Sequence, residues 1–217
     1  SCASPMRKIF GSAITRSIKA WPRCALRANS SGAYTVGLTS RPLKVALVPN
    51  EHLRLNPAEG VLHFWFLEYH QTIGLPAQVN DMTLWSGFIH EAFHRNAVGF
   101  AQSRLNEGMT TYLTAMLLML DQGYRDVSYT SILRFFQETG GTLPYFYDLA
   151  AMLHLIQATG EQPVLDAYFR GDHSRLEAAL GRETWQAITK LADTFEVGPE
   201  FSALRRRYFK EMVRILD

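Results

Sequence analysis

Apolar residues recur at helical spacing through the second half of the chain. After Tyr124 they repeat every three or four positions, which is typical of amphipathic helices packed on a common core. Glycines between these runs mark the ends of successive helices. The pattern predicts helices at 128–138, 145–158, 161–169, 173–180, 183–195 and 199–216.

The first half contains shorter apolar segments. Residues 33–38 and 43–48 have the composition of short strands, and a Ser-Arg-Pro sequence separates them. Residues 61–69 are apolar and aromatic, and they fit either a buried strand or a helix. The chain is therefore expected to belong to the α+β class, mainly α, with a small N-terminal sheet and a helical C-terminal part.

Two further helices are predicted between the strand-like segments and Tyr124. Asn80 or Asp81 is expected to cap the first, which should run to about Gly99. The second should begin near Asn106 and end at Gly123.

Composition is that of an ordinary folded protein. The 217 residues are 47% hydrophobic and 19% charged, and they suffice for one domain with a proper core. We expect a single domain at 33–217, made of a sheet-containing half (33–123) and a helical half (124–217). Residues 1–32 would form a basic arm ahead of it.

Charge is unevenly distributed along the chain. Residues 1–50 contain eight of the 22 Lys and Arg residues and no Asp or Glu, so 14 basic and 20 acidic residues follow. Such an arm is compatible with membrane or nucleic-acid contact, with organellar targeting, with effector delivery, or with packing on its own acidic domain. Cys2 and Cys24 both lie in the arm and leave the compartment open. No apolar run is long enough to span a bilayer.

The strongest chemical signal is an H-E-x-x-H motif formed by His90, Glu91 and His94. On a helix, residues four apart share a face, so both imidazoles can bind one metal ion. Two histidines and a carboxylate are typical ligands of catalytic zinc. Glu91 is then placed to act as a general base on a metal-bound water, and Glu107 is the candidate third ligand.

Residues 105–113, which begin Leu105-Asn106-Glu107-Gly108, resemble the second zinc motif of the gluzincins, the clan of thermolysin and the aminopeptidase N family. The resemblance implies a zincin-like catalytic domain in which Glu107 completes a Zn²⁺ site with His90 and His94. It covers about thirty residues. The twelve residues between His94 and Glu107 make a shorter link than is usual in those families.

The resemblance also implies peptide-bond hydrolysis, with a peptide or protein as substrate. In gluzincins a tyrosine or histidine after the third ligand often stabilises the oxyanion, and Tyr147 is preferred here. The other candidates are Tyr145, His154 and Tyr168. The chain lacks the G-x-M-E-N-type motif of the aminopeptidases, which favours an endopeptidase.

Several neighbouring residues have subsidiary roles in this prediction. Gly108 is expected to permit close approach to the metal helix. The hydroxyl of Thr110 or Thr111 is expected to contact the free N–H of a ligand histidine. His63 and His70 are more typical of structural histidines than of metal ligands.

Other functions remain open. The chain is also compatible with a secreted or injected toxin-like metalloprotease that acts on a specific protein. A binding protein in which zinc only joins two helices would keep the ligands but have no use for Glu91 as a base. The basic segment 205–210 is most simply a solvated helix face, and no nucleic-acid partner is expected.

Overall fold

A computed structural model describes residues 44–48, 65–67, 72–76, 80–100, 104–125, 127–141, 145–194 and 201–217. For the first three segments, and for residues 201 and 202, only the backbone is described. The expected basic arm at 1–32, the expected strand at 33–38, His63 and His70 lie outside the described residues.

Eight helices form the described part from Asn80 onward. They are α3 (Asp81–His94), α4 (Arg104–Asp121), α5 (Tyr129–Thr139), α6 (Phe146–Thr159), α7 (Glu161–Arg170), α8 (Ser174–Leu180), α9 (Arg182–Thr194) and α10 (Phe201–Leu216). The six helices expected after Tyr124 are all found, with ends within two residues of the expected ones. None of the helices in this part is long and apolar enough to cross a membrane.

Helix α3 begins where the sequence predicts and ends earlier than expected. Asn80 is its N-cap, and the Asn80 side chain accepts a hydrogen bond from the Thr83 backbone N–H at 2.8 Å. The helix ends at His94 instead of near Gly99. Just beyond that end, the Asn96 side chain donates to the Ala92 carbonyl at 2.8 Å and so satisfies a carbonyl of the last turn.

Three short strands precede the helices. They are β1 (Lys44–Val48), β2 (Trp65–Leu67) and β3 (Thr72–Pro76), in the order β1-β3-β2. β1 pairs with β3 in parallel, and β2 pairs with β3 antiparallel.

The expected α+β class with a zincin-like core is wrong. In the described residues from Asn80 to Asp217 there are eight helices and no strand, so the part that can be described with its side chains is all-α. Every buried hydrophobic residue of the described core lies at or after Ile89, on or between these helices. The short apolar segments indicated strands, but the helices with long apolar periodicity build the described core.

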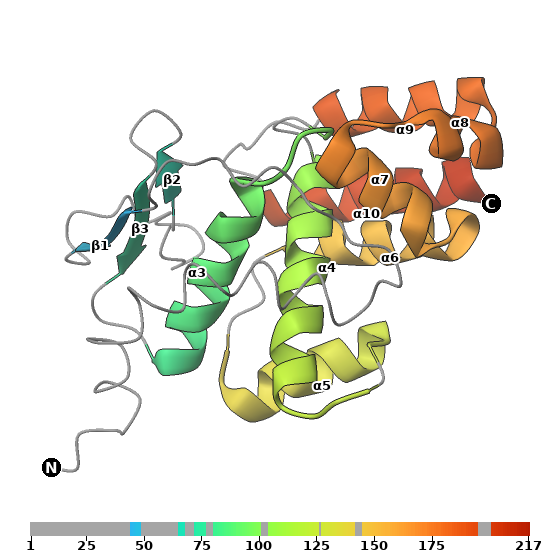
Figure 1. The fold of residues 1–217 in the computed structure, drawn as a ribbon. Coiled ribbons are helices and arrows are strands. Elements are labelled where there is room, and N and C mark those ends of the chain that lie inside the picture. Colours follow the sequence, from blue (N-terminus) through green and yellow to red (C-terminus); the bar gives the residue numbers. More distant parts are fainter. Residues whose placement is uncertain are drawn as a thin grey trace, which may run out of the picture.

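The core lies among α4, α6 and the helices that surround them. Helix α3 and helix α4 lie side by side and run antiparallel, so the end of α3 is next to the start of α4 (Figure 1). On the other side of α4, helix α6 packs against it and is covered in turn by α10. Fully buried side chains such as Met109, Leu149 and Met152 fill this contact.

Gly108 permits a close helix contact, but the partner differs from the expected one. A Cβ atom at this position would lie 2.5 Å from the Asp148 carbonyl oxygen and 3.1 Å from Met152 Cβ. Both atoms belong to α6, whereas the sequence suggested the metal helix, α3. Glycine is therefore required for the α4–α6 contact, on the side of α4 away from the expected one.

We predict that Gly108→Ala destabilises the protein by about 1 to 3 kcal/mol, because the added methyl group overlaps backbone that cannot move freely. Urea unfolding followed by circular dichroism measures the change. Helix propensity alone would stabilise this variant by about 1 kcal/mol. A midpoint that stays the same or rises would therefore contradict the described α4–α6 packing.

Candidate metal centre

His90, His94 and Glu107 converge at the contact between α3 and α4. His90 Nε2 lies 3.2 Å from Glu107 Oε2, and His94 Nε2 lies 3.3 Å from the same oxygen. The two Nε2 atoms are 2.9 Å apart. The three side chains predicted as ligands therefore form one group in which each offers a ligand atom.

The spacing of these atoms fits a small metal ion. Bonds of about 2.0 to 2.1 Å at tetrahedral angles place ligand atoms about 3.4 Å apart. Both nitrogen–oxygen distances, 3.2 and 3.3 Å, are close to this value. The nitrogen–nitrogen distance of 2.9 Å is shorter, so the two imidazoles would separate slightly around an ion. The group could hold a metal ion.

A chain of hydrogen bonds orients the His94 ring. His94 Nδ1 donates to Asn106 Oδ1 at 3.0 Å and lies 3.3 Å from Thr110 Oγ1. Thr110 Oγ1 donates to the same Asn106 oxygen at 3.1 Å and so accepts from the Tyr168 hydroxyl at 2.7 Å. A proton held on Nδ1 leaves the Nε2 lone pair directed at the other ligand atoms.

Of the two threonines expected to contact a candidate ligand histidine, Thr110 makes the contact with His94. Thr111 does not. The Thr111 hydroxyl is buried and has no hydrogen-bond partner in the described part of the chain. Both threonines are almost fully buried, at 0% and 3% exposed. They differ in the helix face that carries them, which gives a matched pair for experiment.

Burial and charge set the protonation of the site. Burial raises the pKa of the Glu107 carboxyl, but hydrogen bonds and charge from the two histidines outweigh burial and hold this pKa well below its usual range. Burial lowers the pKa of His94, yet its hydrogen bond and charge interaction with Glu107 raise it overall. Glu107 therefore remains an anion, as a metal ligand must.

Glu91 lies beside the ligand group without joining it. Its side chain is buried, with 7% of the residue exposed, and it forms no side-chain hydrogen bond in the described part of the chain. Burial raises the pKa of the Glu91 carboxyl above its ordinary value of 4.5, against the opposing charges of His90 and His94. The carboxylate is consequently more basic than an exposed glutamate.

Tyr145 covers the His90 ring. The two rings are stacked, with centroids 5.2 Å apart and an angle of 6° between their planes. The Arg205 guanidinium lies over the Tyr145 ring at 4.5 Å and so reaches this residue from α10. Burial, together with the charges of Glu107 and Glu91, raises the pKa of the Tyr145 hydroxyl, which stays protonated.

A buried carboxylate anchors Arg205. Asp148 Oδ2 lies 3.5 Å from Arg205 Nε, and Asp148 Oδ1 lies 3.8 Å from Arg104 Nη1. Asp148 is 1% exposed, and burial raises its pKa to about 6 although both arginines oppose the shift. The ion pairs of Asp148 with Arg104 and Arg205 thereby connect α6 to α4 and to α10, next to the Tyr145 ring.

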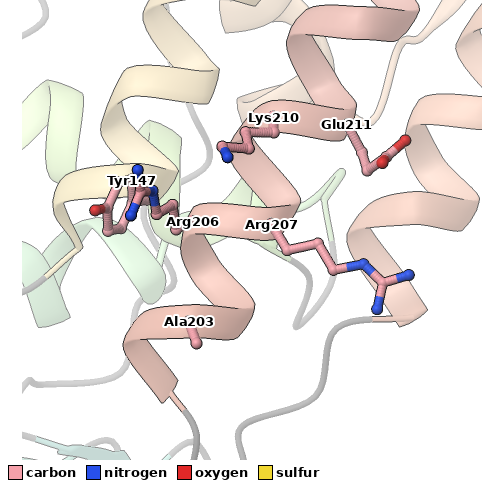
Figure 2. Close-up of a pocket in the computed structure, with 6 residues that line it drawn as sticks. All are labelled: Tyr147, Ala203, Arg206, Arg207, Lys210 and Glu211. Carbon is pink, nitrogen blue, oxygen red and sulfur yellow. The ribbon is translucent and has the colours of Figure 1, made fainter.

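The structure does not bring Tyr147, the preferred oxyanion residue, to the metal centre. Tyr147 packs on Phe146 and Phe209 and lines a cavity with residues of α10 (Figure 2). No ring contact or hydrogen bond joins it to the ligand group in the described part of the chain. Tyr145 is the N-cap residue of α6 and Tyr147 lies in its first turn, so the two side chains leave the chain in different directions.

The other two oxyanion candidates also lie elsewhere. His154 Nε2 is 3.1 Å from Asp217 Oδ1, near the end of α10. Tyr168 is fully buried, and its hydroxyl is hydrogen-bonded to Thr110, which in turn contacts His94. Only Tyr145, of the four candidates, touches a ligand residue in the described part of the chain.

Sequence reasoning gave no role to Asn106, Arg205 or Asp148. Asn106 stands directly before Glu107 in the quoted motif, so its position was a signal that it belongs to the site. Arg205 lies in a basic run that resembled a solvated helix face, and nothing in the sequence around Asp148 indicated a role for it.

Comparisons with protein-family models, with curated proteins and with solved structures gave no match.

We predict that Thr110→Val lowers zinc affinity about 10- to 100-fold, because it removes a hydroxyl that orients His94 and Asn106. Competition with a chromophoric chelator measures the affinity. The matched control is Thr111→Val, which removes a buried hydroxyl without a partner and should leave zinc affinity unchanged. Equal effects of the two substitutions would contradict the described hydrogen-bond chain.

Proposed function

We propose that the chain is a zinc-dependent peptidase, with His90, His94 and Glu107 as ligands and Glu91 as the general base. The observation that carries this proposal is the convergence of two imidazoles and a carboxylate beside a second, buried carboxylate that is not a ligand. Structural zinc sites use four protein ligands, whereas catalytic sites use three and leave a position for water or substrate. Among the described residues three ligand side chains meet.

The donor set favours zinc over harder ions. Two neutral nitrogens and one carboxylate suit Zn²⁺, whereas Mg²⁺ and Ca²⁺ prefer sites built from oxygen. When bound in such a site, zinc supplies Lewis-acid chemistry by polarising a carbonyl and lowering the pKa of water to about 7. The similarity of residues 90–94 and 105–113 to the gluzincin motifs supports a peptide bond as the target.

Glu91 is suited to hold and move the proton in this reaction. It follows a ligand histidine directly, and its raised pKa brings its basicity nearer to the pH at which a base is needed. Its side chain forms no hydrogen bond within the described part of the chain that would have to break first. We assign it proton uptake from the attacking water and delivery to the leaving amine.

Tyr145 is the group we assign to contact the substrate carbonyl. It is stacked on a ligand residue, and its hydroxyl is kept protonated, so it can donate a hydrogen bond. A donor directed at a developing oxyanion stabilises the transition state more than the ground state. This assignment replaces Tyr147.

Three classes of zinc protein would use these residues differently. An endopeptidase is favoured because the aminopeptidase motif is missing from the sequence. An effector or toxin that cleaves one protein would use the same residues. A non-catalytic zinc protein would need the three ligands but not Glu91, and this difference decides between the classes.

We predict that Glu91→Gln lowers kcat for peptide hydrolysis by about 10²- to 10⁴-fold or more while the protein still binds one zinc ion, because only the base is removed. Cleavage of a quenched-fluorescent peptide library and plasma mass spectrometry measure the two properties. His94→Ala is the comparison variant and should lose both. A Glu91→Gln protein with full activity would overturn the assignment of the base, and a native protein that takes up no zinc would overturn the whole proposal.

We predict that Tyr145→Phe lowers kcat about 10²-fold and leaves zinc content unchanged, because the ring still covers His90 while the donor is lost. Steady-state kinetics on a substrate selected from the same library measures the change. Tyr129→Phe removes a hydroxyl from a tyrosine that packs on Phe146, and it should behave like the native protein. An active Tyr145→Phe variant would assign carbonyl stabilisation to another group.

A further inference from the structure

A basic cavity lies beside the first turn of α6, two residues after Tyr145. Its volume is about 550 Å³. Tyr147 forms one wall, and the remaining lining comes from α10: Ala203, Arg206, Arg207, Lys210 and Glu211. Figure 2 shows Arg206 and Lys210 on the part of α10 that faces Tyr147.

The cavity has an excess of positive charge. Arg206 and Lys210 are exposed and stand four residues apart, so they project from one face of α10. Neither lies within ion-pair distance of a carboxylate in the described part of the chain. Glu211, the acidic residue in the lining, is paired with Arg214 at 2.9 Å, so its charge is already compensated.

The cavity is built from residues next in sequence to those that cover the candidate metal centre. Arg206 follows Arg205, whose guanidinium is 4.5 Å from the Tyr145 ring, and that ring is 5.2 Å from the His90 ring. The residues that line the cavity thus adjoin, in sequence, those that cover His90: Tyr147 follows Tyr145 on α6, and Arg206 follows Arg205 on α10.

We propose that this cavity binds an acidic segment of the peptide substrate, which makes it a specificity site; its role in cleavage rests on the function proposed above. Arginine and lysine bind carboxylates well, and arginine can do so with two parallel hydrogen bonds. The Tyr147 ring offers a surface for the aliphatic part of a Glu or Asp side chain. The site thus selects substrates that carry Glu or Asp in a segment away from the bond that is hydrolysed.

Charge favours an acidic peptide over a nucleic acid. Residues 51–217 contain 14 basic and 20 acidic residues, so a long polyanion would be repelled by most of the body. Nucleic-acid binding gains its affinity from many phosphate contacts. A cavity with Arg206 and Lys210 as its uncompensated cations fits a short run of carboxylates better.

Binding is tested on the full chain carrying Glu91→Gln, so that the peptide is not cleaved. Fluorescence anisotropy compares a labelled peptide that contains a run of glutamates with the same peptide carrying glutamines. We expect tighter binding of the glutamate peptide, weakened about tenfold by Arg206→Glu with Lys210→Glu. The matched control, Arg182→Glu with Lys190→Glu, makes the same charge change on exposed residues of α9 and should have little effect.

Equal weakening by both double variants, or no preference for the glutamate peptide, would overturn the proposal. So would a single-stranded oligonucleotide that binds more tightly than the glutamate peptide and loses affinity in the same α10 variant. Zinc content and circular dichroism of each variant exclude loss of folding as the cause.

Cleavage tests the second half of the proposal. With Glu91 intact, kcat/KM for the glutamate peptide should fall about tenfold in the α10 variant, while that for the glutamine peptide stays unchanged. Equal falls for the two peptides would overturn the specificity role. If neither peptide is cleaved by the native protein, the peptidase proposal fails, and the binding experiment still decides whether the cavity takes acidic peptides.

Discussion

The contact between the end of α3 and the start of α4 is the constraint on which the site depends. His90 and His94 are one turn apart on α3, and Glu107 approaches them from the first turn of α4. The His94–Asn106 hydrogen bond, 3.0 Å long, joins the two helices at this point. A shift of one residue in either helix would turn a ligand to another face.

The rest of the fold holds α4 in place for this contact. Gly108 and Asp148 allow α6 to approach α4 closely from the opposite side, and Arg104 reaches Asp148 across the same contact. A buried pair of this kind is costly to break, because a charge would be left without its partner. Helix α4, which carries the candidate ligand Glu107, is thus held by packing on α6 on one side and by the contacts of Glu107 and Asn106 with the two histidines on the other.

The sequence located the helical half well, because helix positions depend on local spacing, and the three candidate ligands do form one group that could hold a metal ion. Glycine positions and apolar periodicity located the six helices after Tyr124, and Asn80 located the start of α3. The pairing of His90 with His94 followed from their spacing on one helix, whereas Glu107 followed from the resemblance of residues 105–113 to a known zinc motif. The α+β class was wrong, because the described part from Asn80 to Asp217 builds its core from helices alone and no strand contributes to it.

Tertiary contacts were harder to predict. The choice between Tyr145 and Tyr147 depends on the orientation of α6, which is set by its packing on α4 and α10. No local pattern contains that information. Gly108 was correctly predicted to permit a close helix contact, but the partner is α6 and not α3. A glycine in the sequence indicates close packing without identifying the neighbouring helix. Arg205 and Asp148 act through partners distant in sequence.

Arg205 stands 115 positions after His90 in the sequence, yet one aromatic ring separates the two side chains. The three candidate ligands, by contrast, lie within 17 positions of one another. Tyr145, at the start of α6, covers His90, and α10 reaches that cover through Arg205. The packing of α10 therefore bears on how the His90 imidazole is held, although the two residues belong to distant parts of the sequence.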